Sequence, residues 1–178
     1  LNNFELITGD GGFDFSTNFN NQENICNKLI LCQILYALAL QKYNGCFILK
    51  MFDIFAKSTI DYIYLLSLFY NRVYIFKPQT SRLANSEKYI ICKNFKFISS
   101  KNYISKFSEI IKQTKNAVDN EYITSFFKIK IPYFYCSKIE EISNVLCQFQ
   151  INIINNTILL IKNNKNEGKT KIDEMVKS

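Results

Sequence analysis

The chain has 178 residues, of which 48% are hydrophobic, and this is enough for one folded domain with a sizeable core, so a wholly disordered chain is excluded. The formal net charge of +7 favours an anionic partner such as nucleic acid, although a solvated basic surface fits the charge equally well. The absence of histidine and of any Cys-x-x-Cys spacing among the six cysteines argues against a zinc site and favours reduced, mostly buried thiols.

The chain begins with a strand-like segment and a glycine-rich turn. Residues 4–8 (FELIT) are typical of a strand, and GDGG at residues 9–12 ends it with a turn whose three glycines let the backbone approach a ligand closely. Asp10 therefore stands at the carboxyl end of this strand.

A long apolar helix is expected next. The pattern over residues 25–41 is helical, with Asn20 or Asn21 as the N-cap and Glu23 in the first turn. Apolar residues on most faces indicate a crossover helix packed on a sheet. Its longest apolar run, residues 29–40, is shorter than the roughly 20 residues that a bilayer requires, so we predict neither a membrane span nor a signal peptide.

A second strand and a second helix follow. Gly45 is expected to end the first helix, and residues 46–49 (CFIL) predict a buried strand with Lys50 at its end. A lone lysine at the end of an apolar strand is unusual. Ser58 is expected to cap the next helix, with Asp61 in its first turn, where a carboxylate suits the helix dipole.

A polar loop that contains Glu87 connects two further strands. Residues 73–76 (VYIF) and 89–92 (YIIC) are short runs rich in β-branched and aromatic residues, and each predicts a buried strand. The order strand, helix, strand, helix, strand indicates a parallel sheet with right-handed crossovers. Residues 89–92 then add an antiparallel strand after the short loop.

Beyond residue 97 the alternation stops and the chain is expected to be mostly helical. A helix is predicted around residues 103–118 and another after Ser137, with Glu140 as its capping partner, whereas residues 151–161 fit either strand or helix. The chain is thus divided into residues 1–98, half of a Rossmann-like sheet; residues 99–162, a mostly helical extension; and residues 163–178, a charged, flexible tail.

Three charged residues from distant parts of the sequence are expected to meet. Asp10, Lys50 and Glu87 each occupy the carboxyl edge of the predicted sheet, and in open α/β sheets ligands bind at that edge. Taken singly, each is more easily explained as a turn, strand-end or surface residue. Together with their flanking sequences, they favour a functional site.

These flanks resemble the RrmJ/FtsJ-like RNA ribose 2′-O-methyltransferases, in particular the branch specific for the messenger-RNA cap in eukaryotes and large DNA viruses. Three blocks carry the resemblance: ELITGDGGFDFS at residues 5–16, GCFILKMFDIF at 45–55 and FKPQTSRLANSEKYIICKNF at 76–95. Residues 20–24 (NNQEN) also look like the viral cap enzymes.

The resemblance implies the carboxyl-terminal half of a class I methyltransferase sheet, with three parallel strands, one antiparallel strand and crossover helices. Family members use a Lys-Asp-Lys-Glu tetrad, whose last three members match Asp10, Lys50 and Glu87. Lys50 would then be the base or the group that steers the ribose hydroxyl, with Glu87 as its orienting partner. Asp10 would bridge the methyl group and the lysine, and Asp10, Gly11 and Gly12 would bind S-adenosyl-L-methionine.

Part of the family pattern has no counterpart in this sequence. The first lysine of the tetrad, the glycine-rich cofactor loop and the acidic residue that holds the cofactor's ribose would all lie before Leu1. Either an amino-terminal half of the same protein supplies the rest of the cofactor site, or this chain cannot bind the cofactor properly and is inactive alone. The protonation state of Lys50 stays open, since a sulfonium lowers the pKa of a nearby lysine and carboxylates raise it.

RNA is expected at the same edge, with Lys77, Arg82 and Asn85 in contact with phosphates or ribose. Three other basic residues are expected to be only solvated: Arg72, Lys88 and Lys93.

The leading hypothesis for the function is an S-adenosylmethionine-dependent RNA 2′-O-methyltransferase acting on the first nucleotides of capped messenger RNA. The alternatives are a ribosomal-RNA 2′-O-methyltransferase and a non-catalytic domain that binds RNA or a protein. We expect an intracellular location, nuclear or cytoplasmic, and cytoplasmic for a viral protein.

Overall fold

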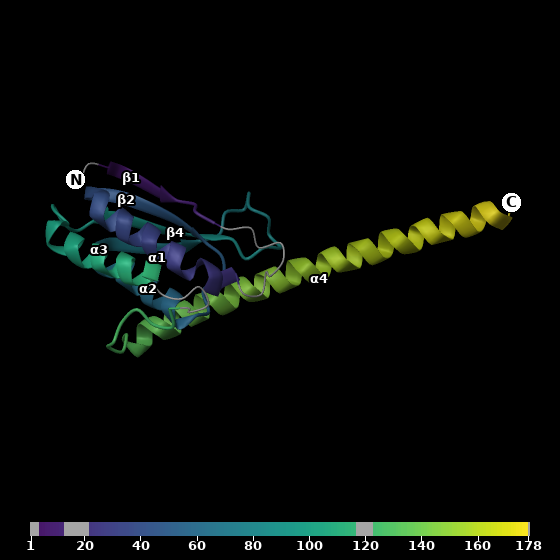
Figure 1. Cartoon of the computed structure of the whole chain (residues 1–178). Helices are drawn as coiled ribbons and strands as arrows, with labels where there is room; N and C mark the ends of the chain where they lie inside the picture. Colours follow the sequence, from purple (N-terminus) through teal and green to yellow (C-terminus); the bar gives the residue numbers. More distant parts are fainter. Residues whose placement is uncertain (1–3, 13–21, 117–122, 178) are drawn as a thin grey trace.

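The computed structural model describes residues 4–12, 22–116 and 123–177, in which four strands form one mixed sheet with helices packed on it (Figure 1). In chain order the elements are β1 (Phe4–Gly9), α1 (Gln22–Leu40), β2 (Gln41–Met51), α2 (Lys57–Phe69), β3 (Tyr70–Phe76), β4 (Lys88–Phe95), α3 (Lys101–Asn116) and α4 (Tyr133–Lys177). The predicted α/β class with a helical carboxyl-terminal part is confirmed.

The strands lie in the order β1-β2-β4-β3. β1 and β2 pair in parallel, whereas β4 runs antiparallel to both β2 and β3. β1, β2 and β3 therefore share one direction, which gives the predicted three parallel strands and one antiparallel strand. The antiparallel strand β4 is inserted between β2 and β3, so that the short loop from β3 turns back into the interior of the sheet.

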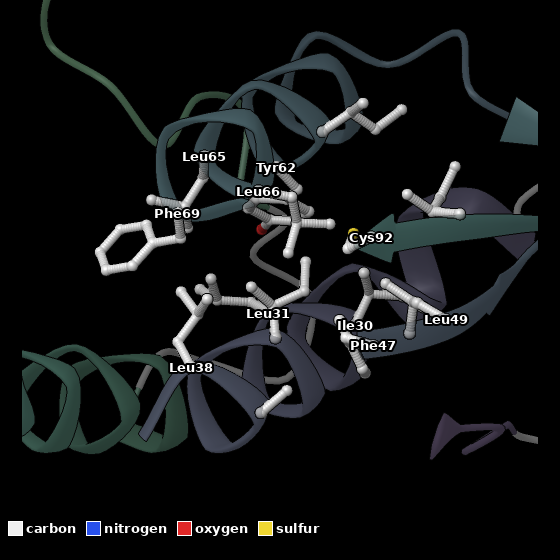
Figure 2. Close-up of a cluster of buried hydrophobic side chains, with 14 of the residues drawn as sticks. Ile30, Leu31, Leu38, Phe47, Leu49, Tyr62, Leu65, Leu66, Phe69 and Cys92 are labelled. Atoms are coloured by element: carbon white, nitrogen blue, oxygen red, sulfur yellow. The ribbon is translucent and has the colours of Figure 1, made fainter. Parts of the chain in front are cut away.

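The core lies between the central strands and the helices α1 and α2. Figure 2 shows Phe47, Leu49 and Cys92 of the sheet beside Leu31 of α1 and Leu66 of α2, and all five are almost inaccessible to solvent. Burial of each of these leucine and phenylalanine side chains stabilises the fold by roughly 2 kcal/mol. The intervening strand residues point to the opposite face of the sheet. None of the six cysteines forms a disulfide, as predicted, but only Cys26 and Cys92 are buried, so the prediction that most of them are buried is wrong.

The first helix ends earlier than its pattern indicates. α1 stops at Leu40 and β2 begins at Gln41, so Gly45 lies within β2 and does not end the helix. The buried side chain of Gln41 explains the early strand: its Nε2 donates a hydrogen bond to the carbonyl of Phe4 in β1 at 2.8 Å, and its Oε1 accepts one from the hydroxyl of Tyr70 at 2.9 Å. The predicted caps Asn20 and Asn21 lie outside the described residues.

Ser58 does not cap α2, contrary to the prediction. The N-cap is Ala56, which makes no side-chain cap bond, and its backbone N–H donates to the carboxylate of Glu23 in α1 at 2.8 Å. The Ser58 hydroxyl accepts a hydrogen bond from the amide of Asn27 at 2.6 Å. The start of α2 is thus held by side chains of α1 and not by a cap from its own segment.

Asp61 is likewise not a first-turn residue, because α2 begins at Lys57 and has no acidic residue in its first turn. Its side chain is fully buried, and its Oδ2 accepts hydrogen bonds from the hydroxyl of Ser125 at 2.8 Å and from the backbone N–H groups of Phe126 at 2.6 Å and Phe127 at 3.2 Å. The carboxylate therefore anchors the segment before α4.

α4 begins at Tyr133, so Ser137 lies inside the helix and is not its cap. The carbonyl of Pro132 accepts the first hydrogen bonds, from the N–H groups of Tyr135 and Cys136, and proline is favoured at a helix start. Residues 151–161 are helical, and the helix continues to Lys177, extending away from the sheet (Figure 1). The division into three regions and the flexibility of the tail stay predictions.

Two described helices are long and apolar enough to cross a bilayer: α1 and the Tyr133–Asn163 part of α4. α1 contributes to the core, as a central helix of a folded domain does, whereas in the Tyr133–Asn163 part of α4 only Ile139 and Ser143 are buried. The absence of a membrane span therefore stays a prediction.

Candidate active site

The strand register brings Asp10, Lys50 and Glu87 to one edge of the sheet. The last pair of the β1–β2 ladder places Asp10 beside Lys50, near the carboxyl end of β2. Lys50 in turn pairs with Tyr89 across the β2–β4 ladder. Glu87 precedes Tyr89 by two residues, so both side chains project from the same face of the sheet as Lys50.

The three side chains converge on the ammonium group of Lys50. Its Nζ lies 2.9 Å from Oδ1 of Asp10 and 4.0 Å from Oε2 of Glu87. The side chains of Lys50 and Glu87 are 25% and 20% exposed, whereas that of Asp10 is 70% exposed. The expected meeting of these residues is observed, and their catalytic roles stay predictions.

The surroundings of Lys50 favour its charged form. The hydrogen bond to Asp10 raises the pKa of Lys50, and the charges of Asp10, Glu87 and Tyr89 add to this effect, while burial opposes it. The ring of Phe52, whose centroid lies 5.9 Å from Nζ, also suits a cation. Among the described groups, those that raise the pKa of Lys50 outweigh the effect of burial, so these surroundings favour an ammonium at neutral pH.

Glu87 is oriented by two neighbours. Its Oε1 accepts a hydrogen bond from the hydroxyl of Tyr89 at 3.0 Å, and its backbone N–H donates to Oδ1 of Asn85 at 3.2 Å. The hydrogen bond to Glu87 is the main reason that the pKa of Tyr89 is raised. Oε1 of Glu87 thus accepts the hydrogen bond from Tyr89, and Oε2 faces Lys50.

The glycine turn after β1 is held by Gln33 of α1. Oε1 of Gln33 accepts a hydrogen bond from the backbone N–H of Gly11 at 2.8 Å. A Cβ added at Gly9 or Gly11 would lie 2.9 Å or 3.1 Å from the Gln33 side chain, whereas one at Gly12 would meet nothing within 4 Å. Gly9 and Gly11 therefore allow a close approach of a protein side chain, and Gly12 borders open space.

The residues predicted to contact RNA have different surroundings. Lys77 Nζ donates to the backbone carbonyls of Asn85 at 2.8 Å and Glu87 at 2.9 Å, and burial lowers the pKa of Lys77 although the charge of Glu87 raises it. Asn85 holds the N–H of Glu87, and Arg82 is exposed on the loop. Lys77 and Asn85 thus fix the loop that carries Glu87, and RNA contact by all three stays a prediction.

Lys88 is not a solvated residue, contrary to the prediction. It is only 5% exposed, and its Nζ donates hydrogen bonds to the backbone carbonyls of Phe52 and Ser86. The signal was present in the sequence, because a strand that places Glu87 on one face places Lys88 on the other, with the apolar side chain of Ile90.

The chemistry of this edge fits the methyl end of S-adenosylmethionine. The carboxylate of Asp10 suits a sulfonium cation, and the open space at Gly12 leaves room beside it. Asp10, Gly11 and Gly12 are all exposed, so the described residues form one open side of such a site.

The comparisons with known proteins bear on the segment that contains these residues. The sequence profile of a family described as FtsJ-like methyltransferase matches residues 1–95. The chain is 46% identical over 91 residues to "Cap-specific mRNA (nucleoside-2'-O-)-methyltransferase 1" of Danio rerio and 44% identical to that of Homo sapiens, with 51% of this chain and 11% of each relative covered.

A protein of the same name from Caenorhabditis elegans is 35% identical over 129 residues, which are 71% of this chain and 14% of that relative. The chain thus spans between 11% and 14% of the length of these relatives. Among solved structures, a ribosomal RNA methyltransferase from Plasmodium falciparum aligns with a TM-score of 0.41 and 20% identity, over 53% of this chain and 48% of that one.

Proposed function

Because the chain belongs to the FtsJ-like methyltransferase family, we propose that it contributes Asp10, Lys50 and Glu87 to an RNA 2′-O-methyltransferase that uses S-adenosyl-L-methionine. The proposed substrate is the ribose of the first nucleotides of capped messenger RNA, as the names of the relatives support. We also propose that an amino-terminal part of the same protein completes the cofactor site, and that the protein acts in the nucleus or cytoplasm.

The observation that carries this proposal is the position of Lys50 between two carboxylates at the carboxyl edge of the sheet. A lysine that served only as a surface charge would not need an oriented glutamate on one side and an aspartate at hydrogen-bond distance on the other. A half-buried ammonium held by carboxylates is instead a rigid hydrogen-bonding group with a defined direction.

Positioning is a large part of catalysis in this reaction, because the attacking oxygen must lie in line behind the methyl carbon. S-adenosyl-L-methionine, when bound, would supply the methyl group to the ribose oxygen, with its thioether as the leaving group. Lys50, aimed by Glu87 and Asp10, holds the hydroxyl by a hydrogen bond. To accept the hydroxyl proton, Lys50 must first lose its own, and the two carboxylates oppose that loss.

Substitution of Lys50 in the complete protein tests the function. Lys50→Ala is expected to abolish transfer of a radiolabelled methyl group to capped RNA, while cofactor affinity measured by calorimetry stays largely intact, because the lysine acts on the hydroxyl. Lys50→Arg is expected to fail as well, since a guanidinium stays protonated and has a different geometry.

Lys93→Ala, at an exposed lysine of β4, is the matched control and should keep wild-type activity. Undiminished turnover by Lys50→Ala would contradict the catalytic role. Transfer to a ribosomal-RNA fragment but not to capped RNA would move the substrate to the other branch of the family. RNA binding without any methyl transfer by the wild-type protein would favour a non-catalytic domain.

A further inference from the structure

Lys88 lies directly beneath the candidate site. It follows Glu87 in the chain and pairs with Met51 across the β2–β4 ladder, one step beyond the pair of Lys50 and Tyr89. Because side chains alternate along a strand, Glu87 faces the site and Lys88 faces the opposite side of the sheet, where it is 5% exposed.

The ammonium of Lys88 connects two backbone segments that carry the reacting residues. One of its acceptors is the carbonyl of Phe52, two residues after Lys50, and the other is the carbonyl of Ser86 at 2.7 Å, the residue before Glu87. Phe52 and Lys88 are 36 residues apart in the sequence. A single side chain therefore fixes the end of β2 against the start of β4, where the distance from Lys50 to Glu87 is set.

Stability alone does not account for a lysine at this position. Burial lowers the pKa of Lys88 to about 8, which shows that the site disfavours the charge. The charged and titratable groups around it are Asp53 and Glu23, which favour the ammonium, Lys77, which disfavours it, and Cys147 on α4. An apolar residue such as methionine would fill the same volume without that cost.

We propose that Lys88 is a positioning residue, which holds Glu87 at the correct distance and angle from Lys50 by joining the backbone at Phe52 to the backbone at Ser86. This inference rests on the proposed function for its catalytic consequence. Its structural consequence, the mutual placement of Glu87, Lys50 and Tyr89, is independent of that function.

The test replaces Lys88 by methionine in the complete protein, which keeps the length of the side chain and removes the donors. Lys93→Met is the matched control, since Lys93 lies on the same strand and is exposed. With Lys88→Met we expect kcat for methyl transfer to fall about 100-fold, the effect of a misplacement of about 1 Å, with the cofactor Kd unchanged. Lys93→Met should leave both constants unchanged.

A second readout needs no activity. In proteins labelled with ¹³C in lysine and tyrosine side chains, NMR titration reports the pKa values of Lys50 and Tyr89, both of which Glu87 raises. If Lys88→Met releases Glu87, the pKa of Tyr89 should fall towards its ordinary 10.0 and that of Lys50 towards 10.5.

The outcomes separate the two proposals. A wild-type protein without methyl transfer would defeat the proposed function, yet a change in both pKa values in Lys88→Met would still establish the positioning role. Unchanged pKa values in a folded Lys88→Met variant would overturn the inference, whatever the activity. If Lys88→Met does not fold, Lys88→Arg is titrated in the same way, and failure of both variants to fold would assign Lys88 to folding and overturn the inference.

Discussion

At the scale of single residues, Lys88 makes the stability of the domain depend on pH. Its pKa is lowered from 10.5 to about 8 in the folded protein, so between these values the unfolded chain binds more protons than the folded one. Stability therefore rises with pH across this window, and below pH 8 the charged lysine must be buried. The full difference is on the order of 3 kcal/mol.

We predict that the free energy of unfolding of the wild-type protein minus that of Lys88→Met is larger at pH 10 than at pH 7, because Lys88 is uncharged at the higher pH. The measurement is urea denaturation of both proteins across that range, and Lys93→Met is the control, because an exposed lysine has no such burial cost. An equal difference at both pH values would mean that Lys88 keeps an ordinary pKa in the folded state.

Glu87 could be identified as a candidate site residue from the sequence, whereas the positioning role proposed for Lys88 could not. Asp10, Lys50 and Glu87 were predicted from their positions at the ends of strands and from the family resemblance. The pairing of neighbouring strands then brings their side chains together. A lysine is expected in solvent by default, and only strand alternation places Lys88 among apolar residues. Its two carbonyl acceptors depend on backbone positions that no local pattern specifies.

At the scale of secondary-structure elements, polar side chains join one element to another rather than capping their own. Glu23 of α1 accepts the N–H that opens α2, and Asp61 of α2 holds the segment before α4. Sequence patterns located the starts of the helices to within a few residues, but they did not predict that α4 continues to Lys177. The predicted caps Ser58 and Asp61 were wrong because a serine or aspartate near a helix start also suits a contact with a neighbouring element, and only packing decides between the two.

Asp61→Ala should therefore detach the segment around residues 125–127. It removes a fully buried acceptor of two backbone N–H groups, and we expect a loss of about 3 kcal/mol in the free energy of unfolding. The midpoint of urea denaturation measures this loss. Ser125→Ala, which removes one donor to the same oxygen, should cost only about 1 kcal/mol. Equal effects of the two variants would show that the backbone N–H groups do not depend on Asp61.

At the scale of the whole molecule, one side of the sheet is open. Among the described strands β1 pairs only with β2, and its side chains Phe4 and Leu6 are 53% and 58% exposed. Tyr74 and Phe76 of β3 are 45% and 50% exposed on the face that carries the site. Composition predicted a folded domain and the order of strand and helix patterns predicted its α/β class, and the fold confirms that class. Residues 73–76 were predicted to form a buried strand, and this was wrong because β3 lies at an edge of the described sheet.

The last prediction concerns the 178-residue chain on its own. Asp10, Gly11 and Gly12 are exposed and form one side of the cofactor site, so we expect this chain to bind S-adenosyl-L-methionine weakly or not at all. On its other side β1 pairs with no described strand, so this exposed apolar edge offers backbone groups to other chains, and we expect the isolated chain to aggregate. Calorimetric titration and size-exclusion chromatography of the purified chain measure both properties, with the complete protein as the control. Micromolar binding by a monodisperse monomer would show that these residues already form a complete site, and that no other part of the protein is needed to enclose the cofactor.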